Sequence, residues 1–144
     1  MNSQQILSLS QLEQLKTSGA GYDILRYIGL PDVLGEQSET ILYFLGRQLA
    51  RKFDIQSLEE LIEIYQLMDW GKLDLVKKKK KEWIFHLMSD SGFLRLKASF
   101  PVDFRLEAGF LAEALQNLKQ VECECTEDIN KRIHLVKFSV HFIS

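Results

Sequence analysis

The chain has 144 residues, with 18 basic and 20 acidic side chains and a formal net charge of −2. This length fits one domain over residues 1–144 with a core large enough to fold unaided. The near-balanced charge gives no overall attraction to nucleic acid, and two cysteines are too few for a disulfide framework. No signal peptide is recognised, and no apolar run reaches the roughly 18 residues of a transmembrane helix, so we expect a cytoplasmic protein.

Four helices are expected in the first half of the chain, where apolar residues recur at helical spacing. They cover residues 3–18, 22–28, 38–53 and 57–68. Pro31 is expected to interrupt the chain after the second helix. Ser57 and Glu60 form a capping-box pattern for the fourth helix, and Gly71 stands where a glycine would end it.

The pattern then changes to alternation of apolar and polar residues, which predicts strands. Alternating segments are centred on Leu73 and Leu75 and continue at residues 83–88, 93–100, 121–125 and 136–142. A helical pattern over residues 104–119 separates the first group of strands from the last hairpin. This segregation predicts an α+β fold, with the N-terminal helices packed on one face of an antiparallel sheet and a helix inserted between two hairpins.

A run of five lysines, Lys77 to Lys81, lies between two of these strands, at the expected tip of a hairpin. Like charges in a row repel one another and favour solvent, so a solvated turn is the main interpretation. A contact with phosphate or anionic lipid is the alternative. Nucleic-acid binding would need a wider patch interleaved with aromatic residues, whereas Trp83 and Phe85 are expected in the core, so none is predicted.

Cys123 and Cys125 are two residues apart on an expected strand, so their side chains point the same way. That spacing does not suit a disulfide, and zinc would need two further ligands. A hairpin turn near Ile129 and Asn130 would place His134 opposite Cys125, and nothing supplies a fourth ligand. We therefore expect no metal and no cofactor, with both cysteines packed in the core; a modifiable thiol at a pocket wall is the alternative.

No motif in the sequence names a reaction. The three histidines, His86, His134 and His141, lie on expected strands without a nucleophile in a recognisable arrangement. The many glutamates fall on polar helix faces. No catalytic residue is therefore assigned, and we expect a protein that is not an enzyme.

Short elements spread over most of the chain resemble the YslB-like family of Firmicutes, a domain family of unknown function. The matching elements are Gly21-Tyr22-Asp23, Leu25-Arg26, Leu30-Pro31, Leu34-Gly35, Ile41-Leu42-Tyr43, Gly46-Arg47, Leu49-Ala50-Arg51, Trp70-Gly71 and Leu106 to Ala112. None is chemically diagnostic alone, and their order and number carry the resemblance.

The segment from Phe104 to Leu115, followed by a strand with cysteine, is more distantly similar to 4-vinyl reductase domains and small TRAPP tethering subunits. Those share an α+β fold with haem nitric-oxide sensors. The resemblance implies a sheet packed on helices, with an apolar cavity between them in some members. The zinc pattern of some relatives is not reproduced, and the Tyr-x-Ser-x-Arg pattern of the haem sensors is absent, so haem is not expected.

Gly109 stands inside a helical pattern, where glycine costs about 1 kcal/mol relative to alanine. Close approach of another backbone would offset that cost, and Gly46 with Ala50 allows the same. The alternatives are tight helix packing and a groove that admits an acyl chain or a partner's side chain. Candidate residues for such a pocket are Tyr43, Gly46, Ala50, Phe85, Gly109, Phe110, Cys123 and Cys125.

The leading hypothesis is a non-enzymatic binding or adaptor domain that forms a homodimer and binds a protein partner. Small TRAPP-type folds associate through helical faces, and the amphipathic segment 3–18 is one such face. The rival hypothesis is a sensor or carrier whose apolar pocket takes a lipid or hydrocarbon. An enzyme with a concealed site is the third.

Overall fold

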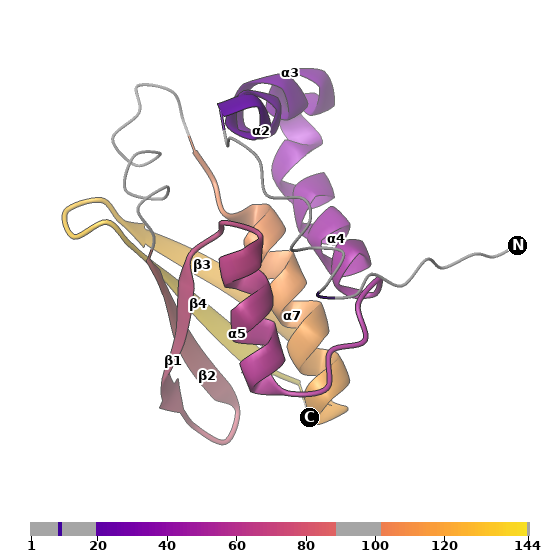
Figure 1. Cartoon of the computed structure of the whole chain (residues 1–144), viewed down its shortest axis with the longest axis vertical. Helices are drawn as coiled ribbons and strands as arrows, with labels where there is room; N and C mark the ends of the chain where they lie inside the picture. Colours follow the sequence, from indigo (N-terminus) through magenta and orange to yellow (C-terminus); the bar gives the residue numbers. More distant parts are fainter. Residues whose placement is uncertain (1–8, 10–19, 89–101, 144) are drawn as a thin grey trace, which may run out of the picture.

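The computed structural model describes Leu9 and residues 20–88 and 102–143. The chain forms an antiparallel sheet with helices on one face, and a helix lies between the two hairpins (Figure 1). The elements in order are α2 (Ala20–Ile24), a π-helical turn (Leu25–Gly29), α3 (Leu30–Leu34), a 3-10 turn (Gly35–Gln37), α4 (Ser38–Ala50), α5 (Leu58–Leu67), β1 (Lys72–Lys78), β2 (Glu82–Met88), α7 (Arg105–Lys119), β3 (Cys123–Asn130) and β4 (Leu135–Phe142). The expected α+β architecture is confirmed.

The sheet has the strand order β1-β2-β4-β3, and each neighbouring pair is antiparallel. Phe85 on β2 stands opposite Phe138 on β4, and both are fully buried beneath the helices. The alternation that predicted the two hairpins therefore sorts the side chains between core and solvent as expected. The expected strand over 93–100 and the expected helix over 3–18 lie outside the described residues, apart from Leu9.

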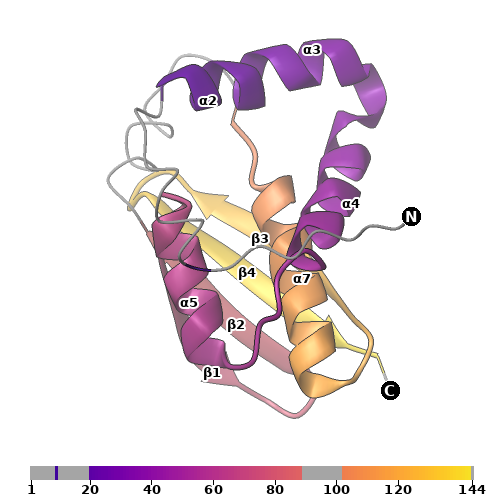
Figure 2. The same cartoon turned by 45° about the vertical axis from the view of Figure 1, so that its right-hand side comes forward.

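The N-terminal helical segment continues through Pro31, where the sequence predicted an interruption. Pro31 sits in the first turn of α3, directly after the π-helical turn, and the chain stays helical on both sides of it. The direction changes at Gly35, whose φ of 68° favours glycine. Figure 2 shows α2 and α3 crossing one end of the molecule before α4 turns down beside α7.

The predicted cap of α5 is present. Ser57 Oγ accepts a hydrogen bond from the Glu60 N–H at 3.2 Å, and the Glu60 carboxylate accepts one from the Gln56 N–H at 3.1 Å. The helix ends at Leu67, with Met68 as its C-cap, as expected, but the residue that follows in the left-handed conformation differs from the prediction. Asp69, with a φ of 60°, takes the left-handed position predicted for Gly71, which follows in the turn with a φ of 130°.

The core lies between the helices and the sheet and is centred on Phe110 of α7. Its ring meets those of Phe53, Tyr65 and Trp70 edge to face, with centroid separations of 5.7, 5.8 and 5.3 Å. These contacts join α7 to the C-terminal part of α5, to the turn that follows it and to the segment after α4. Within residues 20–88 and 102–143, no helix has the length and apolar content needed to cross a membrane.

Candidate functional site

The α4 and α7 helices cross with their backbones in contact, at Gly46 and Gly109. A Cβ built on Gly46 would overlap the carbonyl oxygen of Leu106, and one on Gly109 would overlap that of Tyr43. The space beside each glycine is therefore filled by the other helix. This crossing fixes the height at which α4 stands over the sheet.

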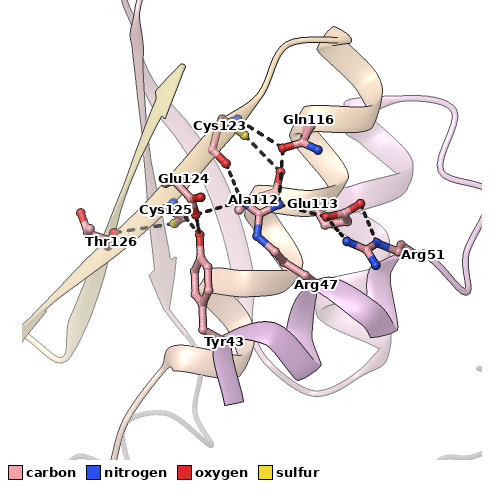
Figure 3. Close-up of polar contacts among 10 residues, drawn as sticks. All are labelled: Tyr43, Arg47, Arg51, Ala112, Glu113, Gln116, Cys123, Glu124, Cys125 and Thr126. Carbon is pink, nitrogen blue, oxygen red and sulfur yellow. Dashed lines mark hydrogen bonds and ion pairs between the residues drawn. The ribbon is translucent and has the colours of Figure 1, made fainter. Parts of the chain in front are cut away.

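The inner face of α4 reaches the edge strand β3 and satisfies its open backbone groups (Figure 3). The Cys125 N–H donates to Tyr43 Oη at 3.0 Å, and the Arg47 guanidinium donates to the Cys123 carbonyl oxygen. Gln116 of α7 accepts from the Cys123 N–H at 3.3 Å. An edge strand otherwise presents such groups to another chain, so these side chains close this part of the edge.

Two arginines and two glutamates form ion pairs around this contact. Together with a tyrosine and a glutamine they make up what we call the edge cluster: Tyr43, Arg47, Arg51, Glu113, Gln116 and Glu124. Arg47 bridges Glu113 and Glu124, each at 2.9 Å, and Arg51 binds the second oxygen of Glu113 at 2.9 Å. Burial acts to raise the pKa of Glu113, yet hydrogen bonds from Arg51 and Arg47 hold it below its usual value. The Glu124 pKa is lowered in the same way by Tyr43 and Arg47.

The Tyr43 phenol is held in its neutral form. Burial and the hydrogen bond that it donates to Glu124 Oε1, 2.6 Å long, raise its pKa to about 12. At neutral pH the phenol therefore both donates to Glu124 and accepts from the strand. The edge cluster is a structural clamp between α4, α7 and β3, with its charges already paired.

Both cysteines are free and buried against this clamp. Burial raises the pKa of the Cys123 thiol to about 11 and also raises that of Cys125. Both thiols are therefore protonated at neutral pH, the form that is a poor nucleophile and a poor metal ligand. Cys125 stands opposite Val140 rather than His134, because the hairpin turns over residues 131–134, later than expected.

A second charged group is buried where the N-terminal helices meet α7. Arg26, 1% exposed, binds both oxygens of Asp103 at 3.0 and 2.9 Å and Glu107 Oε1 at 3.1 Å. Glu107 is fully buried. We call these three residues the Arg26 triad. Burial opposes the charge on Arg26, and its two carboxylate partners raise its pKa.

The sequence alone does not indicate that Arg26 and Arg47 are buried. The available signal was the position of Arg47 on the helix face that also carries Leu42, Tyr43 and Gly46, where a charge needs a buried partner. That partner could not be named, because Glu113 and Glu124 lie more than 60 residues away in the chain. The same holds for Arg26.

The residues proposed for an apolar pocket are all buried, and most of them pack within one core. Ala50 also lines a pocket of about 300 Å³ with Phe53, Ile55 and Glu113. A larger pocket, of about 450 Å³, lies at the starts of α4 and α7 beside the outer half of β3. Half of the residues that line it are charged, and the sequence did not predict it.

This larger pocket contains an ion pair between Arg105 and Glu127, 2.7 Å long. Burial raises the pKa of Glu127 even though Arg105 opposes the shift, and Asp103 and Glu39 add to it by repulsion. The pocket therefore holds several carboxylates with one arginine.

Large apolar side chains are exposed on the N-terminal helical segment and on α4. This outer apolar surface comprises Ile24, Leu25, Ile28, Val33, Ile41, Phe44 and Leu45. Val33 is 81% exposed and Phe44 58% exposed. On α4 its members recur at helical spacing on the side opposite the buried Leu42 and Gly46. Both faces of α4 are thus apolar, but only one is covered.

Comparison with known proteins gives a family match over most of the chain. The family model described as "Protein of unknown function (DUF2507)" matches residues 19–141. The chain is 35% identical to the uncharacterized protein YslB of Bacillus subtilis over 133 residues, which cover 92% of this chain and 90% of that protein. It is 26% identical to the uncharacterized protein MJ1642 of Methanocaldococcus jannaschii over 107 residues, covering 74% of this chain and 65% of that one.

Among solved structures, the chain is similar to a vinyl-4-reductase family protein from Methanocaldococcus jannaschii. The TM-score is 0.69, with 94% of this chain and 88% of the other covered and 20% identity. At that identity the likeness establishes the fold, and the predicted relation to the 4-vinyl reductase fold is confirmed.

Proposed function

This chain belongs to the DUF2507 family of proteins of unknown function, and from that premise we propose a binding domain without catalytic activity that acts as a homodimer. The two copies associate through the outer apolar surface. The proposal places this dimer in the cytoplasm, where it serves as an adaptor for a protein partner.

The exposure of the outer apolar surface is the observation that carries this proposal. Val33, Phe44 and Ile24 each leave more than half of the side chain open, on adjoining helices. Monomeric soluble proteins rarely leave large apolar patches uncovered. A second copy supplies an equally apolar surface, and in a two-fold interface the same patch serves both subunits.

The state of the ionisable groups supports a role without catalysis. Both thiols are buried with raised pKa values, and the phenol of Tyr43 is neutral and bonded on both sides. The carboxylates of Glu113 and Glu124 are bound to arginine. A nucleophile or general base needs a group that is free to change its charge near neutral pH, and the edge cluster uses its groups to join elements instead.

Native mass spectrometry of the purified chain tests this function against the rival carrier function. We expect a species of twice the 16.7 kDa chain mass, without added mass. Phe44→Asp should convert it to the monomer, because the aspartate would be buried without a partner in the interface. A monomer that retains lipid mass would contradict the proposal and favour the carrier.

A further inference from the structure

Six lysines gather at one end of the molecule, at the turn between β1 and β2 and the end of α7. Five are consecutive in the hairpin, Lys77 to Lys81. The sixth, Lys119, joins them through Trp83: the Nζ atoms of Lys78 and Lys119 lie 4.8 and 5.1 Å from the centre of its ring. We call these six residues the lysine tip.

The charge of the lysine tip is not compensated locally. The hairpin lysines are exposed, and in the part of the chain that the structure describes none of the six takes part in an ion pair. The neighbouring Glu82 faces His141 at 3.8 Å instead. With these six set aside, 12 basic residues remain against 20 acidic ones. The small net charge therefore conceals a positive end on a negative body.

We propose that the lysine tip docks the protein on an anionic lipid surface. A compact cluster of four to eight lysines matches the charge that attracts polybasic segments to anionic headgroups. The tip is the end of a protruding hairpin (Figure 1), so several ammonium groups can approach a flat bilayer together. The body, which carries the excess of carboxylates, is turned away from the surface in that orientation.

The aromatic side chain at the tip argues for lipid rather than nucleic acid. Single strands are bound by exposed aromatic rings that stack on bases along a basic groove. Trp83 is only 7% exposed, and its ring is flanked by Lys78 and Lys119. The ammonium groups thus remain at the surface while the ring serves as their support.

The lysine tip lies at the other end of the molecule from α2 and α3, which carry part of the outer apolar surface. In both views the β1–β2 turn is at the lower end, whereas α2 and α3 lie at the upper end (Figures 1 and 2). A dimer formed through the helices leaves the tip free. Lipid docking therefore does not depend on the proposed dimer, and a monomer would bind through the same residues.

Co-sedimentation of the full chain with vesicles tests the proposal. Vesicles of equal parts phosphatidylcholine and phosphatidylglycerol should bind the protein, those of phosphatidylcholine alone should not, and added salt should release it. Lys79→Gln combined with Lys80→Gln should lower partitioning on the order of 30-fold, since each lysine near the surface contributes about a fivefold factor. These side chains make no contact that folding needs, and circular dichroism checks this.

A charge-matched variant separates the tip from net charge. Lys131→Gln combined with Arg132→Gln removes two positive charges at the β3–β4 turn, at the other end of the sheet, and should bind like the wild type. Equal losses in the two variants would overturn the proposal, as would wild-type protein that ignores the anionic vesicles. Binding to a single-stranded oligonucleotide in place of vesicles would overturn it too.

Discussion

Two glycines decide how closely the central helices approach each other. At Gly46 and Gly109 the partner helix places its backbone where a Cβ would stand, and a backbone cannot move aside as a flexible side chain can. The cost of glycine inside a helix is therefore offset by the contact that it permits. The choice between glycine and alanine here is governed by space rather than by helix propensity.

Gly109→Ala should destabilise the protein, although alanine is the better helix former. The added methyl group would meet the Tyr43 carbonyl and force the helices apart, and overpacking of this kind costs about 1 to 3 kcal/mol. Gly109→Leu should cost more and disturb the edge cluster. Urea unfolding measures both.

Gly21→Ala is the matched control, since nothing lies within 4 Å of the position its Cβ would take. It should be neutral or stabilising by up to about 1 kcal/mol. If Gly109→Ala behaves like Gly21→Ala, the close backbone contact does not exist.

The carboxylates of the edge cluster predict how stability depends on pH. The pKa values of Glu113 and Glu124 are lowered on folding, so their contribution is present above the ordinary value of 4.5 and is lost as the pH falls through the folded values. Glu113→Gln should therefore flatten the acid side of the stability profile. Urea unfolding at a series of pH values from neutral downward provides the test.

Glu127 should affect the pH dependence of stability in the opposite direction. Its pKa is raised on folding, so the folded state takes up its proton first and gains stability as the pH falls. Glu127→Gln removes that gain and should steepen the loss on acidification. If both variants shift the profile in the same direction, the assigned charge environments are wrong.

At the level of elements, the Arg26 triad joins the N-terminal helices to the rest of the fold. Ile24 of α2 and Val33 of α3 are exposed, whereas Arg26 between them is buried against Asp103 and Glu107. Removing one member of a buried ion pair leaves an uncompensated charge, at a cost of about 3 to 5 kcal/mol. The triad therefore anchors the segment that carries part of the outer apolar surface.

Arg26→Leu should therefore destabilise the protein by about 3 to 5 kcal/mol and increase hydrogen exchange across residues 20–34 before the sheet is affected. Arg51→Leu is the control: its side chain is 53% exposed, so the loss of its pair with Glu113 should cost under about 1 kcal/mol. If both variants lose similar amounts of unfolding free energy, burial does not make the Arg26 triad more important for stability than an exposed ion pair.

The elements that the sequence predicts well are those whose pattern is local. The alternation around Trp83 and Phe85, the cap at Ser57 and the helix before Lys119 follow from short-range periodicity, and all are present. Errors fall at ends and turns, such as Gly71 and the β3–β4 hairpin. Moving a helix end or a turn by one or two residues changes the local free energy little, so tertiary packing decides its position.

The candidate sites could be predicted only in part, because they depend on long-range contacts. Gly46 and Gly109 indicate in the sequence that another part of the chain approaches each helix closely. They do not indicate that each glycine lies against the backbone of the other helix. The acidic partners of Arg26 and Arg47 come mainly from α7 and β3, far away in the chain. From the sequence alone, both arginines would therefore be placed on the surface. The outer apolar surface also escaped prediction, since an exposed and a buried apolar stripe look alike.

At the scale of the whole molecule, the two proposed surfaces would contact different partners. The lysine tip would face a lipid surface, and the outer apolar surface, on the N-terminal helices and α4, would face a second copy. The edge cluster and the Arg26 triad hold the elements between them. An adaptor needs such separated surfaces, because each can then be occupied without displacing the other.

Sedimentation velocity over a range of protein concentrations tests the dimer most directly, with wild type, Phe44→Asp and Ile133→Asp compared. Ile133, at the β3–β4 turn, is 53% exposed, similar to Phe44 at 58%, but lies outside the outer apolar surface. We expect a concentration-dependent dimer for wild type and Ile133→Asp, and a folded monomer for Phe44→Asp. A wild-type monomer at every concentration, or a dimer that Phe44→Asp leaves intact, would contradict it.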